Sequence, residues 1–211
     1  PCLEKQGLFL YIQVGRSRLF FHAIEGFPFS PYFCSFAIHL KTKAMTGIFF
    51  GSTTGTTEEL AGKIAAVLGV AAADIHNVGN TGADVVNRYD LLLLGTSTWG
   101  DGELQDDWYD FLDALKKQDL TGKKIGLFGC GDVESYPDTF CDGVGLIYEA
   151  LAGNGCRWVG TYTPEGYAVT DSKVCKEGKF VGLAIDECNE SALTDGRIER
   201  WVSALKNDGA L

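Results

Sequence analysis

Long apolar runs are missing from this sequence. The chain has 211 residues, and charged or His residues interrupt its apolar N-terminal stretch before about 18 apolar residues can follow one another. We therefore expect no membrane span. With 45% hydrophobic and 22% charged residues, the chain can bury one good core, so a second full domain is not expected.

Cysteine spacings typical of metal sites or redox motifs are also missing. The seven cysteines are an odd number, and none of them forms a CxxC pair. A chain of this size needs no disulfide to stabilise its core, so we expect reduced thiols, a cytoplasmic location and no metal site. The cysteines are Cys2, Cys34, Cys130, Cys141, Cys156, Cys175 and Cys188.

Basic residues are scarce. The 18 Lys and Arg residues face 28 Asp and Glu residues, which gives a formal net charge of -10. Residues 1–44 hold five of the basic residues and only two of the acidic ones, so the rest of the chain is more acidic still. Because nucleic-acid backbones attract basic groups, we expect no nucleic-acid partner. The charge favours basic protein partners that are met by electrostatic steering.

Methionine occurs once, at Met45, immediately before the first clear strand. The stretch before it is rich in aromatic residues but shows neither sustained periodicity nor a clear secretory signal. We expect residues 1–44 to be an N-terminal extension, weakly structured or non-native, and residues 45–211 to form the folded domain. A targeting segment or a structural addition are the alternatives for the extension. Its aromatic residues are Phe9, Tyr11, Phe20, Phe21, Phe27, Phe29, Tyr32, Phe33 and Phe36.

From Met45 onward, short apolar runs alternate with helical periodicity. The runs predict strands at 46–51, 74–78, 90–95, 124–130 and 157–161. Apolar stripes predict helices around 60–68, 108–115, 140–151 and 198–205, with a weaker helix at 81–87. Strict alternation of this kind is typical of an α/β fold, a doubly wound parallel sheet with helices on both faces.

A loop rich in hydroxyl groups follows the first predicted strand. Hydroxyls and free N–H groups at a helix N-terminus form an anion site, and phosphate is the expected anion. The loop lacks the Gly-Lys-Ser/Thr of a Walker P-loop and the spaced glycines of a dinucleotide site. By itself it is also typical of an ordinary Ser/Thr-rich helix cap. Its residues are Ser52, Thr53, Thr54, Gly55, Thr56 and Thr57.

The loops after the third and fourth predicted strands each carry an aromatic residue among small residues. These are Trp99, within 96–103, and Tyr136, within 129–138. The carboxyl ends of parallel strands meet at one edge of the sheet, where ligands bind in such folds, so we expect both rings there. Two aromatic rings beside a phosphate site can hold a flat ring between them by stacking.

Residues 45–211 resemble the flavodoxin family. The loop 52–57 matches the family motif T/S-x-T-G-x-T, residues 98–108 resemble its first flavin loop, and residues 129–142 resemble its second. Residues 166–187 are similar to the long-chain subgroup, in which an insertion, here about 162–180, splits the fifth strand. The resemblance implies a sheet of five parallel strands in the order 2-1-3-4-5, a bound FMN and a monomeric electron carrier. Flavodoxin is itself a standard example of the ligand-edge rule, so that rule adds no independent support.

The resemblance also implies roles for single residues. The hydroxyl-rich loop would hold the FMN phosphate, while Trp99 and Tyr136 would cover the two ring faces, Tyr136 being the more coplanar. Asp132 and the backbone near Gly131 would address the pyrimidine edge, and Asp142 the ribityl hydroxyls. The full expected set is Ser52, Thr53, Thr54, Gly55, Thr56, Thr57, Ser97, Thr98, Trp99, Gly100, Asp101, Gly102, Cys130, Gly131, Asp132, Tyr136, Thr139 and Asp142.

Gly100 is expected to permit a backbone change beside the flavin. Flipping the peptide between Gly100 and Asp101 would convert a type II turn into a type II′ turn, which requires φ > 0 at its first central residue. We therefore expect Gly100 to take positive φ in the flipped form.

Acidic residues gather on both expected flavin loops. No Lys or Arg occurs in 89–115 or in 125–156. Carboxylates near the flavin would oppose added negative charge, which predicts a low-potential carrier whose second electron is disfavoured. The resemblance implies redox partners that dock at this acidic face, such as ferredoxin/flavodoxin–NADP reductase, pyruvate oxidoreductase, nitrogenase or a photosystem.

Two other functions are compatible with such a fold. An FMN-dependent, quinone-reductase-like oxidoreductase is the main alternative, but the sequence offers no evident catalytic His or nicotinamide site. A phosphoacceptor signalling domain would need acidic residues after the first strand, where this chain has hydroxyls. We therefore predict an electron-transfer protein and not an enzyme.

Overall fold

The computed structural model describes residues 10–14, 17–21, 44–163, 166–167, 169 and 171–211. The chain divides into two compact units, Pro1–Lys41 and Thr42–Leu211. In the first unit, β1 (Leu10–Val14) and β2 (Ser17–Phe21) pair antiparallel, a pairing that we did not expect. Cys2, Cys34 and most of the N-terminal aromatic residues lie outside the described residues.

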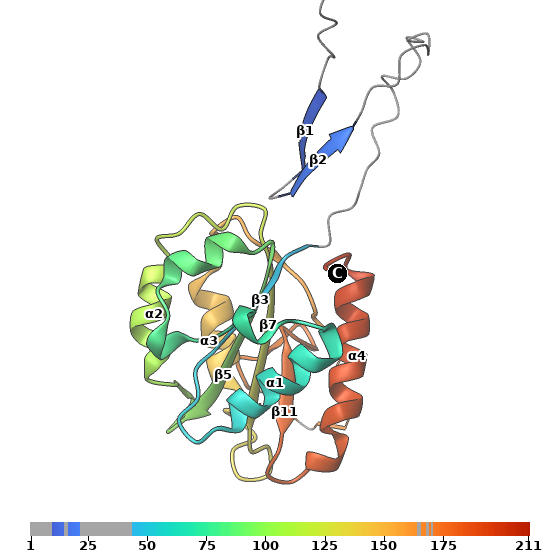
Figure 1. Ribbon diagram of the computed structural model, residues 1–211. Helices are drawn as coiled ribbons and strands as arrows, with labels where there is room; N and C mark the ends of the chain where they lie inside the picture. The colour runs from blue at the N-terminus through green and yellow to red at the C-terminus, as the bar shows by residue number, and fades with distance from the viewer. Residues whose placement is uncertain (1–9, 15–16, 22–43, 164–165, 168, 170) are drawn as a thin grey trace, which may run out of the picture. The chain divides into compact units, whose positions relative to one another are not determined.

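The second unit is built on a parallel sheet whose main strands are ordered β11-β7-β5-β3-β4 (Figure 1). Its strands are β3 (Thr46–Phe50), β4 (Ile75–Asn77), β5 (Leu91–Trp99), β7 (Lys124–Gly131) and β11 (Leu183–Asp186). Numbered along the chain as the first to fifth strands of this sheet, they lie in the order 2-1-3-4-5. The predicted fold class and strand order are therefore confirmed.

The α-helices of the second unit lie on both faces of the sheet (Figure 1). One core cluster contains residues of α1 (Thr56–Leu68) and α4 (Thr194–Asn207), and the other contains residues of α2 (Asp107–Leu115) and α3 (Asp142–Ala150). Side chains of β5 alternate between the clusters: Leu91 and Leu93 join the first, Leu92 and Leu94 the second. Because all four leucines are fully buried, β5 is a central strand covered on both faces.

The weak helix predicted at 81–87 is wrong in type. Residues Ala83–Arg88 form a 3-10 helix. The segment is too short to repay the cost of nucleating an α-helix, and its two adjacent valines are poor helix formers. Val86 is nonetheless fully buried, so the turn closes the core beneath α2.

The fifth sheet position is filled by two separate strands. β8 (Arg157–Trp158) pairs with the start of β7, and β11 pairs with its end. The predicted strand 157–161 thus supplies only the first part. Between them lies the insertion, with β9 (Cys175–Lys176) and β10 (Lys179–Phe180) paired antiparallel.

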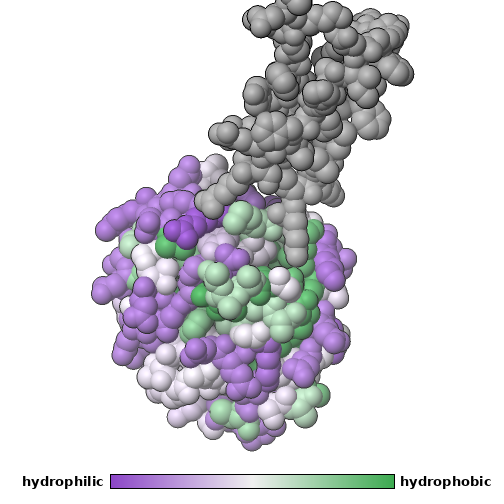
Figure 2. Space-filling model, in the orientation of Figure 1, coloured by the Kyte–Doolittle hydropathy of each residue, from purple (hydrophilic) through white to green (hydrophobic). Residues whose placement is uncertain are grey.

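Charged and polar residues dominate much of the visible surface of the second unit, and a smaller hydrophobic area lies over the side of α1 and α4 (Figure 2). Val67 of α1 is 51% exposed. Within the described residues, every helix is too short or too polar to cross a membrane.

Candidate functional site

The loops that follow β5 and β7 enclose a pocket at the carboxyl edge of the sheet. Its volume is about 300 Å³. Seven of the eight residues around it were predicted from the sequence, and Cys141 is the exception. The lining residues are Thr98, Trp99, Gly100, Gly131, Asp132, Tyr136, Thr139 and Cys141.

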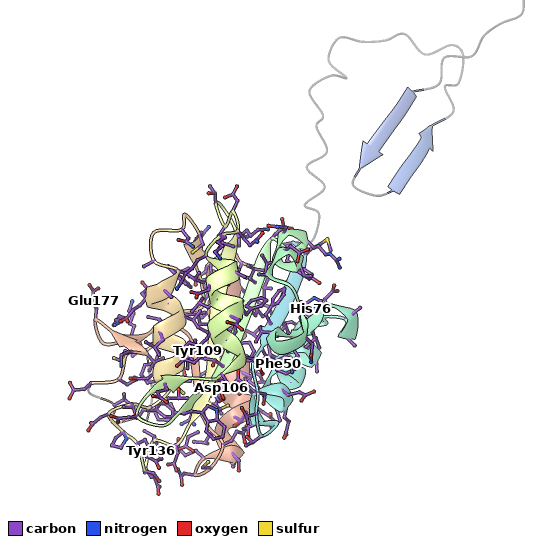
Figure 3. All side chains as sticks on the ribbon, turned by 90° about the vertical axis from the view of Figure 1, so that its left-hand side faces the viewer. Phe50, His76, Asp106, Tyr109, Tyr136 and Glu177 are labelled. Carbon is purple, nitrogen blue, oxygen red and sulfur yellow. The ribbon has the colours of Figure 1, made fainter. Side chains whose placement is uncertain are left out.

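Two aromatic rings are exposed at this pocket. Trp99 is 41% exposed and Tyr136 is 60% exposed, although both are large hydrophobic residues. The indole Nε1 of Trp99 donates a hydrogen bond to Ser97 Oγ at 2.9 Å, which helps to orient the ring. Figure 3 shows Tyr136 on the loops at the lower end of the sheet. Exposed rings that line one pocket are suited to stacking on a flat ligand.

The hydroxyl-rich loop leads directly into α1. Gly55 precedes the helix with φ 95, and no side chain caps the first turn. Instead, Ser52 Oγ accepts a hydrogen bond from Gly55 N at 3.1 Å, which curls the loop back on itself. The uncapped N–H groups and the positive end of the helix dipole therefore remain available for an anion.

Two of the predicted FMN contacts lie beneath this loop. Thr57 is fully buried, and its Oγ1 lies 3.2 Å from Cys130 Sγ. Burial raises the pKa of the Cys130 thiol to about 11. The thiol therefore stays protonated at neutral pH and joins the loop to β7 as a packing and hydrogen-bonding group.

Asp142 also lies behind the pocket instead of lining it. The residue is 1% exposed, and its carboxylate accepts hydrogen bonds from Ser172 Oγ at 2.9 Å and from Lys173 N at 2.7 Å. The ammonium of Lys173 donates to the other carboxylate oxygen at 2.7 Å, and this bond is the main cause that raises the pKa of Lys173. The start of α3 is thereby tied to the insertion, and folding brings a cation to loops that have no Lys or Arg in their own sequence.

The turn after Trp99 already has the backbone that glycine favours. Gly100 takes φ 52, which has the sign that the flipped form requires, and the flip itself stays a prediction. Ser97, Asp101 and Gly102 are the other predicted residues on this loop, and they do not line the pocket. Gly102, with φ 92, packs close to Asp142.

Gln105 is a structural contact of the hydroxyl-rich loop that we did not include in the expected site. Its side chain is 2% exposed, and Nε2 donates to Thr53 Oγ1 at 3.3 Å and to Asp107 Oδ2 at 2.9 Å. It thus joins the loop to the start of α2. In the sequence, Gln105 is a neutral polar residue directly before the acidic start of a predicted helix. That position was the one feature that could have indicated its role.

Asp186 and Asn189 support the loop after β7 and were also missed. Asp186 is fully buried, and its Oδ2 accepts from Val133 N at 3.0 Å. Asn189 Nδ2 donates to both Asp186 Oδ2 and Asp132 Oδ1 at 2.9 Å. In the sequence, Asp186 is a carboxylate at the end of a short apolar run. Its role could have been predicted only if that run had been identified as the strand β11.

The flavodoxin family model matches residues 48–201. The chain belongs to the flavodoxin family. It is similar to Flavodoxin 1 of Escherichia coli, with 43% identity over 166 residues, which are 78% of this chain and 94% of that protein. With Flavodoxin 1 of Salmonella typhimurium it shares 45% identity over 163 residues, 77% of this chain and 93% of that protein. A structure of Fusobacterium nucleatum flavodoxin bound to flavin mononucleotide is similar, with a TM-score of 0.71 and 32% identity over 78% of this chain and 98% of that one.

Family membership confirms the predicted resemblance and the predicted class of function. Flavodoxins are FMN-based electron-transfer proteins and not enzymes. The pocket of this flavodoxin fits such a group on its own geometry. It offers two exposed rings for a flat ring system and, on the neighbouring loop, a helix N-terminus without a side-chain cap for a phosphate.

Proposed function

We propose that this flavodoxin holds one FMN between Trp99 and Tyr136 and carries single electrons at low potential between larger redox proteins. The observation that carries the proposal is the pair of exposed rings on one pocket, beside an uncapped helix N-terminus. Bound FMN supplies the chemistry, because it can accept and release electrons one at a time. The chain itself binds, orients and partly shields the ring.

The residues divide this work by position. The loop 52–56 would hold the phosphate through backbone N–H groups and hydroxyls, and the backbone at Gly131 would address the polar edge of the ring. Asp132 lines the same pocket and would lie near that edge, and the hydrogen bond from Ser135 N–H lowers the pKa of its carboxyl. A carboxylate there stays negative at neutral pH and opposes further negative charge, which favours a low potential. Thr57, Cys130 and Asp142 would support the loops from behind.

Redox partners would dock on the acidic loops around the pocket. Asp101, Glu103 and Glu134 are exposed there, so a basic face on the partner is the complementary surface. Ferredoxin/flavodoxin–NADP reductase is one such partner in our proposal. A cytoplasmic location and a monomeric state remain predictions from the sequence.

Replacement of Tyr136 tests the proposed FMN site. Tyr136→Ala should weaken FMN binding by roughly 1–3 kcal/mol, by analogy with the loss of an aromatic ring stacked on a base. Tyr109→Ala is the matched control, because Tyr109 is 53% exposed but lies on α2 and does not line the pocket (Figure 3). The measurement is the quenching of FMN fluorescence when each apoprotein is titrated into FMN.

An equal dissociation constant for Tyr136→Ala and Tyr109→Ala would show that the ring is placed elsewhere. A purified protein that binds no yellow chromophore would contradict the FMN proposal itself. Steady oxidation of NADPH without an added reductase would instead favour the FMN-dependent oxidoreductase.

A further inference from the structure

A second pocket lies between the insertion and α4, and it shares no lining residue with the pocket described above. Its volume is about 200 Å³. Tyr162, Thr163 and Tyr167 form its wall on the insertion side. Arg197 and Arg200 complete it from α4, where a spacing of three residues places both on the same side of the helix.

Arg197 is unusually buried for a charged residue, with 3% of its surface exposed. Its Nη2 donates to Glu190 Oε2 at 2.7 Å, and its Cζ lies 4.2 Å from the centre of the Tyr167 ring. Its Nη1 is buried and finds no hydrogen-bond acceptor in the part of the chain that the structure describes. A buried charged donor without an acceptor is costly, so an acceptor that reaches this guanidinium would be stabilising.

Among the described side chains that line this pocket or pair with it, the net charge is positive although the protein is acidic. Glu190 balances one of the two guanidinium groups, and Arg200 is exposed with no ion pair among the described residues. The hydroxyls of Tyr162 and Tyr167 are both directed to Ala184 O, at 3.4 and 3.2 Å. The tyrosines therefore contribute mainly ring surface to the pocket, and the arginines contribute its charged hydrogen-bond donors.

We propose that this pocket binds a small oxyanion, through the carboxylate or phosphate group of a free small molecule. The planar fork of arginine donors matches the oxygens of such groups, and two guanidinium groups on one pocket favour an anion over a cation or a neutral ligand. Thr163, an exposed lining residue, carries a hydroxyl that can serve as a further donor. This site goes beyond electron transfer and does not depend on the proposed FMN contacts.

The test uses the full chain loaded with FMN, so that no phosphate added in the titration can occupy the flavin site. Sodium phosphate, sodium acetate and sodium chloride are added at matched ionic strength, and backbone amide chemical shifts are recorded by NMR. We expect saturable shifts at Tyr162, Thr163 and Tyr167 with phosphate or acetate, and none with chloride. The comparison of phosphate with acetate tells which head group binds better.

Two arginine variants separate a site from general charge attraction. Arg200→Gln should weaken binding by at least about tenfold, since it removes a charged donor from the pocket. Arg88→Gln removes an equal charge from an exposed position outside the pocket and should leave the affinity unchanged. Shifts that grow without saturation, or the same affinity in both variants, would overturn the proposal. The flavin spectrum of each sample shows separately whether the FMN site is intact.

Discussion

At the scale of single residues, glycine conformation decides the shape of the hydroxyl-rich loop before α1. Gly55 takes φ 95, a conformation that costs other residues about 1–2 kcal/mol. A Cβ built on Gly55 meets no atom within 4 Å, so only the backbone strain would be felt on substitution. A substitution at Gly55 therefore tests the cost of its backbone conformation without a steric clash of the added Cβ.

Gly55→Ala should lower the free energy of unfolding by about 1–2 kcal/mol. Gly62→Ala is the control: Gly62 lies inside α1, its Cβ also meets no atom within 4 Å, and alanine should stabilise that helix by roughly 0.5–1 kcal/mol. Urea unfolding of the two variants measures both changes. Two shifts of the same sign would contradict the strain at Gly55.

At the scale of elements, the edge strand β4 is joined to the sheet by a chain of polar side chains. His76 Nε2 lies 2.7 Å from Tyr89 Oη, and Tyr89 donates its own proton to Asp74 Oδ1 at 2.9 Å. Because the tyrosine proton is already used, His76 must donate through Nε2–H. Burial, the largest influence, lowers the pKa of His76, with a smaller contribution from Arg88, against the attraction of Asp74.

This histidine makes stability depend on pH. Its folded-state pKa is below the ordinary value of 6.5, so the unfolded chain binds the proton more readily as the pH falls below that value. The free energy of unfolding should therefore fall between about pH 7.5 and pH 5.5, and His76→Gln should reduce that fall. Urea unfolding of both proteins at the two pH values measures the difference. Identical pH slopes would show that the proton affinity of His76 does not change on folding.

The insertion forms its own hairpin, which contacts Tyr162 at the start of the insertion, and contacts with Asp142 join it to the rest of the unit. Its β9–β10 hairpin turns through Glu177 and Gly178, whose φ values of 53 and 74 are those of a type I′ turn. Phe180 exchanges backbone hydrogen bonds with Tyr162, and Ser172 and Lys173 bind Asp142. The insertion thus closes the space beside α3 and helps to form the arginine-lined pocket.

At the scale of the whole molecule, net charge should control the encounter with redox partners. The chain carries a formal charge of -10, and exposed carboxylates lie on the loops around the pocket that we propose for FMN. Association with a basic reductase should slow as salt is raised, because the Debye length shrinks to about 8 Å at physiological ionic strength. Stopped-flow reduction rates at several salt concentrations test this. Rates that do not change with salt would contradict electrostatic steering.

The N-terminal unit should be dispensable for FMN binding. Met45 already makes contacts of the folded unit, since its N donates to Asp90 Oδ2 at 3.0 Å and its O accepts from Leu91 N at 3.1 Å. A chain of residues 45–211 should therefore fold and bind FMN like the full chain. A chain of residues 46–211 lacks these contacts and should be less stable in urea. Loss of FMN binding by the 45–211 chain would overturn the boundary.

Much of the fold and part of the site follow from local patterns in the sequence. The alternation of apolar runs and helical stripes determined the layers, because side chains a few residues apart decide which face of an element is buried. The loops after β5 and β7 supply the residues that line the pocket, since parallel strands bring their carboxyl ends to one edge. The Trp99 and Tyr136 rings were found in this way.

Only the tertiary structure decided which groups lie behind that pocket. Thr57 meets Cys130, 73 positions away, and Asp142 meets Lys173, 31 positions away. Neither contact has a local pattern, because it depends on how separate elements pack. The same holds for Arg197, a residue of an ordinary amphipathic helix in the sequence. Arg197 is buried beside Tyr167 because the insertion packs against α4. The spacing of residues along the chain does not predict that contact.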